Sequence, residues 1–141
     1  MLPGQRRVWE LLENNPPSYS QSACSGDFIG SFVGPRANGA TWYDLSGRVY
    51  IENEKAICIQ NLSYNGQGPD VKIFIGLKNV HQDEPNSSGR TIPDERGRIS
   101  NLRSYNDETI RLKLSGINAS QLKWLSIWCE QFAVDFGHVN F

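Results

Sequence analysis

Cys129 lies in the C-terminal run LKWLSIWCEQFAVDFGHVNF and is the residue of this chain best suited to redox chemistry. A cysteine becomes reactive when a cation, a helix N-terminus or a metal stabilises its thiolate and solvent can reach the sulfur. Trp128 and Phe132 flank Cys129 in an apolar stretch, which equally suits a small buried side chain or half of a disulfide. The residue types therefore leave two interpretations open, a structural cysteine and a redox or ligand cysteine.

The cysteine count is odd. Cys24 and Cys58 are the other two cysteines, so an oxidising compartment would produce one disulfide and one remaining thiol among the three. Which two residues pair stays open.

Three further positions carry side chains that could act with Cys129. His138 could serve as a second ligand, although a histidine at the end of a strand is the simpler interpretation. Asp70 ends the turn GQGPD and could hold a loop, a calcium ion or a substrate proton, or cap its own backbone. Trp128 and Trp124 share one strand face, where they could pack in the core, stack on a sugar or relay electrons. His81 lies in a polar loop and is expected to be solvated.

Charge and composition exclude several classes of function. The chain has 14 Lys and Arg against 15 Asp and Glu, a net charge of -1, so neither a nucleic-acid surface nor a polybasic membrane patch is indicated. No apolar run reaches the roughly 18 residues of a membrane span, so membrane insertion is not expected. The two histidines are far apart, and no motif predicts a metal cluster or a hydrolase triad.

Three Asn-x-Ser sequons suggest passage through the secretory pathway; they begin at Asn61, Asn86 and Asn118. Asn86 is the most credible acceptor, because it lies in the polar loop HQDEPNSSGR, whereas Asn61 lies at a strand end. Together with the cysteines, the sequons predict an extracellular or lumenal protein. Because MLPGQRRVWE lacks the apolar core of a signal peptide, a signal would have been removed or would lie upstream.

Periodicity predicts an all-β domain after a short N-terminal helix. Helical spacing in GQRRVWELLENN ends at two prolines, so residues 1–23 form a helix and linker and residues 24–141 the β domain. Short apolar runs separated by Gly, Asn and Pro are typical of an antiparallel β-sandwich or a jelly-roll-like fold. A hairpin is expected at 48–62, an interior strand at 70–77, a half-buried strand ending at Leu114 and a long polar loop at 78–98.

The strand at 122–130 is apolar on both faces, with Trp124 and Trp128 on one and Leu125, Ile127 and Cys129 on the other. Such a strand belongs in the centre of the fold.

Five ordered motifs over about 30–139 resemble the DM-thirteen domain family; they are SGRVYI, IQNLSYNGQGPDVKIFIG, IPDERG, LRSYNDETIRLKL and LKWLSIWCEQFAVDFGHV. The resemblance implies a β-rich extracellular domain involved in electron transfer or oxidative modification at cell surfaces. The family's W-C-x-x-F cysteine matches Cys129, for which a bare thiol or a bound haem has been suggested. This sequence departs at Tyr43, where the family often has a histidine, and in having Cys24 and Cys58.

Two hypotheses remain. In the first, the chain is an extracellular redox module centred on Cys129, with Trp128 beside any cofactor, and haem is the cofactor that the resemblance implies. In the second, it is a non-catalytic structural or binding module. In both, the expected partner is an extracellular or matrix protein, a DOMON-type domain or a second copy of the chain.

Overall fold

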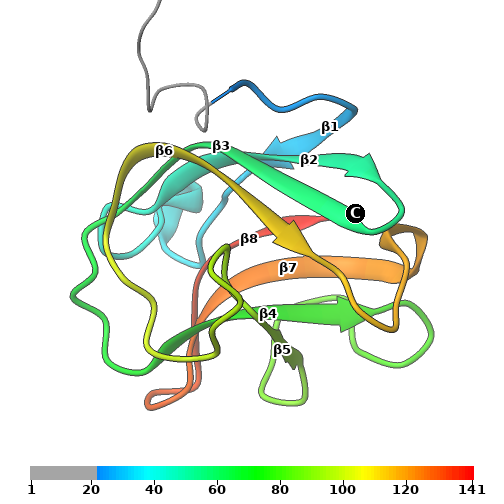
Figure 1. Cartoon of the computed structure of the whole chain (residues 1–141). Coiled ribbons are helices and arrows are strands. Elements are labelled where there is room, and N and C mark those ends of the chain that lie inside the picture. The colour runs from blue at the N-terminus through cyan, green and yellow to red at the C-terminus, as the bar shows by residue number, and fades with distance from the viewer. Residues whose placement is uncertain (1–21) are drawn as a thin grey trace, which may run out of the picture.

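Two four-stranded antiparallel sheets face each other in a computed structural model that describes residues 22–141 of the 141-residue chain (Figure 1). The first sheet has the order β1 (Asp27–Ser31), β2 (Ser46–Asn53), β3 (Ala56–Tyr64) and β6 (Tyr105–Lys113). The second has the order β5 (Arg90–Ile92), β4 (Val71–Leu77), β7 (Leu122–Cys129) and β8 (Val134–Asn140). The predicted β-sandwich is confirmed, and the predicted N-terminal helix lies outside the described residues.

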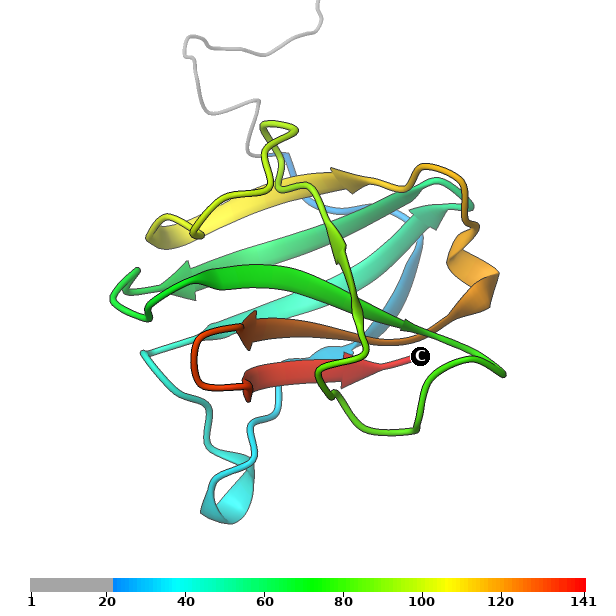
Figure 2. The same cartoon turned by 90° about the horizontal axis from the view of Figure 1, so that it is seen from below.

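The sandwich core forms because alternate residues of each strand point inward. Facing aliphatic side chains from the two sheets are all 2% exposed or less; they are Val49, Ile57, Ile59, Leu112, Ile73, Ile75, Leu125 and Ile127. Burying such side chains stabilises a fold by about 1.5–3 kcal/mol each. Figure 2 shows the two layers from below, with β4 and β7 running side by side.

The predicted hairpin is β2 and β3, which pair on either side of Glu54 and Lys55. The two strands predicted to be interior, β4 and β7, also lie within their sheet, because β5 and β8 flank them. The long polar loop contains β5, a three-residue strand that the composition did not predict. Two 3-10 turns, η3 (Ala37–Gly39) and η4 (Ala119–Gln121), lie in connections between strands.

A second apolar cluster covers the outer face of the second sheet. It contains Phe74, Trp124 and Trp128, which are at most 4% exposed although they point away from the sandwich core. The β4–β5 connection folds over Trp124, whose indole Nε1–H donates a hydrogen bond to the Gln82 carbonyl (2.9 Å). A Cβ at Gly76 would lie 2.2 Å from the Trp124 ring, so this strand position admits only glycine. Both tryptophans are buried as predicted, Trp124 under this loop and Trp128 stacked on Phe74.

His81 is half-buried and holds this connection in place, a role that its position in a polar loop did not suggest. Its Nδ1 accepts a hydrogen bond from the Leu77 backbone N–H (2.8 Å), and its Nε2 lies 2.8 Å from the Ser88 carbonyl. Since Nδ1 accepts, Nε2 carries the proton and donates to Ser88. The ring also contacts Trp124 edge-on, with the ring centroids 6.3 Å apart.

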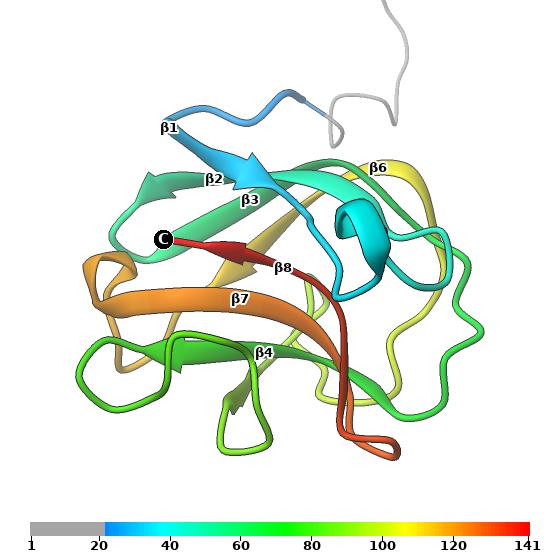
Figure 3. The ribbon, with the colours of Figure 1, turned by 180° about the vertical axis from the view of Figure 1, so that it is seen from behind.

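One side of the sandwich is closed by backbone pairing between the sheets. Beyond the end of β1, Val33 pairs with His138 of β8 through two hydrogen bonds of 2.9 and 2.8 Å. Figure 3 shows the connection between β1 and β2 beside β8 on this side. The connection and the β7–β8 turn meet here, at the end of β7 that carries Cys129.

Candidate redox site

Cys129 is the last residue of β7, and its side chain lies in the sandwich core. Alternate residues of a strand point to the same face, so Cys129 points the same way as Leu125 and Ile127. The residue is 0% exposed and is the free cysteine of the chain. Its thiol S–H donates to the backbone carbonyl of Pro69, with Sγ and O 3.0 Å apart. The buried, hydrogen-bonded thiol is therefore held by the turn that precedes β4.

Tyr64, from the end of β3, reaches the same region and is 1% exposed. Its hydroxyl oxygen accepts a hydrogen bond from the Gly68 backbone N–H (3.1 Å). A Cβ at Gly68 would lie 2.4 Å from the Phe136 ring and 2.7 Å from the Tyr64 oxygen, so glycine is required for the backbone to approach this closely. The turn SYNGQGPD thus brings a phenol and a thiol together under one loop.

Burial raises the pKa of Tyr64 to about 12; the Gly68 N–H bond opposes the rise, and the nearby Cys129 and Tyr43 add to it. The same turn holds both groups, the phenol through the Gly68 N–H and the thiol through the Pro69 carbonyl. The Tyr64 phenol keeps its proton at neutral pH, and the Cys129 S–H is donated to Pro69, so the pair brings no charge into the core.

The alkaline limit of stability should depend on Tyr64. Because its folded pKa is above the ordinary value of 10.0, this stability is complete below pH 10 and is lost as pH rises toward about 12. Absorbance at the phenolate band, followed with the circular dichroism of the fold, should show Tyr64 ionising only as the protein unfolds, together with Tyr105, whose pKa burial also raises. Tyr64→Phe should reduce that coupled step by one tyrosine, whereas Tyr50→Phe, an outer-face control, should leave it unchanged. A Tyr64 that ionises in the folded protein near pH 10 would contradict the assignment.

Aromatic rings connect Tyr64 to the surface. The Phe136 ring lies 6.5 Å from the Tyr64 ring and 4.7 Å from the Tyr43 ring, centroid to centroid. Tyr43 and Phe136 line an apolar groove of about 170 Å³, completed by Trp42, Phe132 and Val134. Trp42 and Phe132 are 40% and 59% exposed, so the groove opens to solvent.

The turn that presents Tyr43 is strained. Tyr43 and Asp44 have φ of 57° and 60°, and the Leu45 N–H donates to the Trp42 carbonyl (3.2 Å), which closes a type I′ turn. Left-handed backbone at residues other than glycine costs of order 1–3 kcal/mol each and accumulates at functional sites. The fold therefore holds the Tyr43 ring against Phe136 at a local energetic cost.

Asp70 lies next to this site but its carboxylate points away. Lys72 forms an ion pair with it, and Glu130 lies 3.7 Å from the same ammonium. The Asp70 carbonyl accepts the Glu130 backbone N–H (2.9 Å). The residue connects the turn before β4 to the end of β7, and its side chain is 47% exposed.

His138 and Trp128 lie on the opposite face of the second sheet from Cys129. His138 Nδ1 is 2.7 Å from Asp135 Oδ2, and Asp135 Oδ1 accepts hydrogen bonds from the Ser126 hydroxyl (2.7 Å) and the Gly137 N–H (3.0 Å). Trp128 stacks on Phe74 with the centroids 5.6 Å apart. The structure therefore does not bring the predicted histidine or tryptophan to the thiol.

The surroundings of Cys129 do not fit a haem. A thiolate-ligated haem needs an apolar pocket on one side of the sulfur and access for the macrocycle. The Cys129 sulfur is fully buried among core side chains, its proton is donated to Pro69, and His138 projects to the other face. No step is assigned to haem here.

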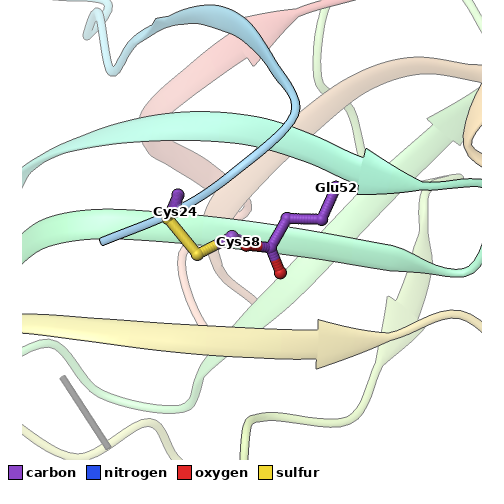
Figure 4. Close-up of side chains that lie close together, drawn as sticks. All are labelled: Cys24, Glu52 and Cys58. Carbon is purple, nitrogen blue, oxygen red and sulfur yellow. A yellow bond between two sulfur atoms is a disulfide. The ribbon is translucent and has the colours of Figure 1, made fainter. Parts of the chain in front are cut away.

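Cys24 and Cys58 form a disulfide, so Cys129 is not a half-cystine (Figure 4). The bridge joins the segment before β1 to the outer face of β3. Glu52 lies beside it, and one ligand atom from each of the three residues falls within 4.8 Å of the others. Sulfur atoms in a disulfide offer no thiolate to a metal.

Tyr64 and Phe136 were not predicted as site residues. Tyr64 ends a strand and Phe136 lies on another sheet, so their contact depends on how the two sheets pack. Within SYNGQGPD, the two glycines and the proline predicted only a turn.

Comparison with known proteins places these features in a family. The model of the family described as "Electron transfer DM13" matches residues 38–141, a range that contains Cys58 and Cys129 but not Cys24. Two curated proteins of Drosophila melanogaster, Protein Skeletor isoforms B/C and isoforms D/E, are 37% identical over 96 residues, 67% of this chain. The match spans 12% and 6% of their respective lengths. No solved structure matches.

Residues 22–141 contain no helix with the length and hydropathy needed to cross a lipid bilayer. The family match covers most of the chain and most of both sheets, including the thiol and the rings around it. The chain belongs to the DM13 electron-transfer family.

Proposed function

We propose that this chain is the electron-transfer module of an extracellular or cell-surface protein and that Cys129 is its redox centre. The observation that carries the proposal is the state of the three cysteines. The Cys24–Cys58 disulfide leaves Cys129 as the one thiol, and that thiol lies within the family match. The family description supports electron transfer as the general activity, and the thiol supplies a group in this chain that can give up an electron.

The proposed step moves one electron from the thiol to an acceptor at the surface. The electron and the S–H proton leave Cys129 together for a tyrosyl radical, which a one-electron oxidant at the surface has generated, and a thiyl radical remains on Sγ. Tyr64 and Tyr43 are the rings that can carry the radical, and the Phe136 ring contacts both of them. Because tunnelling decays steeply with distance, several short transfers are faster than one long transfer.

Flash photolysis tests this role directly. A soluble ruthenium photosensitiser with a sacrificial acceptor generates tyrosyl radicals, whose absorbance decays as an internal donor repairs them. We expect Cys129→Ala to lengthen that decay several-fold and the core control Ile127→Val to leave it unchanged. Circular dichroism verifies that both variants fold. Equal radical lifetimes in the wild type and Cys129→Ala would show that the thiol is not the donor.

A specific observation also favours a second function, that of a binding module. Cys129 is 0% exposed and hydrogen-bonded like a structural core residue, while Trp42 and Phe132 present aromatic surface at the groove. In this alternative an extracellular or matrix protein, a DOMON-type domain or a second copy of the chain occupies the groove. Trp42→Ala would then abolish binding of such a partner, and Cys129→Ala would leave both binding and radical lifetime unchanged.

The extracellular part of the proposal predicts glycans at two of the three sequons. Asn118 is exposed, and Asn86 lies in the surface connection before β5. The Asn61 amide is tied to two other strands, because it donates to Asp107 (2.9 Å) and accepts from Arg48 (2.9 Å), whereas the Asn86 side chain bonds only within its own loop, to Glu84 and Ser88. Expression through a secretory pathway and mass spectrometry after glycosidase treatment should show glycans on Asn86 and Asn118. A mass shift lost in Asn61→Gln, or an unglycosylated secreted chain, would contradict this assignment.

A further inference from the structure

A second group of potential ligands lies on the outer face of the first sheet, away from Cys129. Cys58 is on β3 but does not belong to the sandwich core, whereas its neighbours Ile57 and Ile59 do. The Cys24 and Cys58 sulfurs and a Glu52 carboxylate oxygen are all within 4.8 Å of one another. Figure 4 shows Glu52 beside the disulfide. Two sulfurs and a carboxylate are the donor atoms of a zinc site.

The group would stay assembled without the S–S bond. The Cys24 backbone N–H donates to the Gln60 side chain (2.9 Å), and the Ser25 N–H donates to the Glu52 carboxylate (2.8 Å). Arg111 donates to the Ala23 carbonyl (3.2 Å). These contacts hold the segment that carries Cys24 against β2, β3 and β6. Breaking the disulfide therefore leaves two thiols beside each other.

Glu52 is ready to act as an anionic ligand. Its carboxylate accepts hydrogen bonds from the Ser25 N–H (2.8 Å) and from Arg111 Nη2 (3.2 Å), and such bonds favour the charged form. Its side chain is 10% exposed, and Arg111 Nε lies 3.0 Å from its oxygen. At neutral pH the residue is a carboxylate.

We propose that reduction of the Cys24–Cys58 disulfide turns this group into a binding site for a thiophilic divalent cation, with zinc as the best match. A phosphine reductant places two electrons in the S–S bond, and water supplies two protons to the sulfurs and an oxygen atom to the phosphine. Zinc then binds as both thiol protons pass to buffer. In tetrahedral geometry two thiolates at ~2.3 Å from zinc lie roughly 3.8 Å apart, within the span of the group.

Charge balance supports the site. Two thiolates and the Glu52 carboxylate contribute three negative charges, while zinc and the neighbouring Arg111 guanidinium contribute three positive charges. A partly buried site without net charge avoids the desolvation cost of an uncompensated ion. Water would complete the coordination of a three-ligand site. Cys24 lies outside residues 38–141, which match the family model, so the complete site is not part of that match. The site also does not rest on the proposed function.

Cobalt(II) is the probe that tests this site. The full chain is reduced with a water-soluble phosphine under argon and titrated with cobalt(II), and zinc affinity is then measured by competition with a chromophoric chelator. We expect thiolate-to-cobalt charge-transfer bands with tetrahedral d–d bands at one cobalt per reduced chain, and no such bands in the oxidised chain. Zinc should displace the cobalt.

Variants decide which residues bind. Glu52→Gln keeps both thiols and should weaken zinc binding by about tenfold or more. Cys24→Ser should abolish the charge-transfer bands, and Cys129→Ser should leave them unchanged. Circular dichroism confirms that each reduced chain is folded. Absent bands in folded reduced wild type, zinc affinity unchanged by Glu52→Gln, or bands that disappear only in Cys129→Ser would each overturn the proposal.

Discussion

Replacing Trp124 with alanine should lower the free energy of unfolding by about 3–5 kcal/mol. Trp124 is 0% exposed and forms the centre of the outer cluster with Phe74 and Trp128. The substitution removes one of the two tryptophans of that cluster, leaves a cavity beside Gly76 and removes the indole N–H that donated to the Gln82 carbonyl (2.9 Å). Urea denaturation followed by circular dichroism measures the loss.

Trp42→Ala is the matched control for this prediction. Trp42 is 40% exposed and packs only at the rim of the groove, where Arg36 lies 4.6 Å from its ring centroid. Its removal should cost less than about 1 kcal/mol. Similar losses in the free energy of unfolding for Trp42→Ala and Trp124→Ala would contradict the prediction. They would show that packing of Trp124 under the β4–β5 connection contributes no more to stability than a surface contact.

Removing the disulfide with Cys24→Ala should lower the free energy of unfolding by about 3.8 kcal/mol, the chain-entropy value for its 34-residue separation. The bridge connects the segment before β1 to β3, so the unfolded chain gains freedom over that whole length when the bridge is absent. Chemical denaturation of the oxidised wild type and the variant measures the difference.

Reduction provides the control for the disulfide prediction. In phosphine without added metal, the wild type should fall to the stability of Cys24→Ala, because both chains then lack the bridge. Cys129→Ser should keep the difference between oxidised and reduced protein. A difference between wild type and Cys24→Ala that persists under reduction would mean that the alanine acts through lost packing and not through the bridge.

The spacing of apolar residues predicted those elements that depend on residues close to one another in the sequence. The hairpin of β2 and β3, the interior β4 and the central β7 all follow from alternation and turn residues. β1 was not predicted, because DFIGS is short, contains a glycine and is mostly exposed. β5 exists only because three polar-loop residues, Arg90–Ile92, pair with β4.

The face that each side of β7 packs against could not be predicted. Apolar residues on both faces of β7 indicate that both faces are buried. The alternation of residues does not show which face packs against the other sheet and which is covered by a loop. The β4–β5 connection proved to be the cover for Trp124, and His81 holds it in place through Leu77. A histidine in a polar segment gives no sign of such a role.

Sequence reasoning proposed the central residue of the candidate site but not the residues around it. The position of Cys129 in the W-C-x-x-F motif identified the residue, and its parity placed it opposite Trp128 along the strand. Tyr64 and Phe136 come from different sheets, so only the packed sandwich brings them to the thiol. The pairing of Cys24 with Cys58 also depends on tertiary structure, because three cysteines allow three pairings.

The bridge between Val33 and His138 determines where another strand can be added to this domain. The bridge joins the chain just after β1 to β8, which are edge strands on one side of the sandwich. Among the described residues, the edge strands on the other side are β6 in the first sheet and β5 in the second. β5 has three residues, and β6 presents exposed Asp107, Arg111 and Lys113. Short and charged edges resist strand-to-strand association between molecules. The domain can therefore be present at high local concentration with little tendency to polymerise through the edges of its sheets.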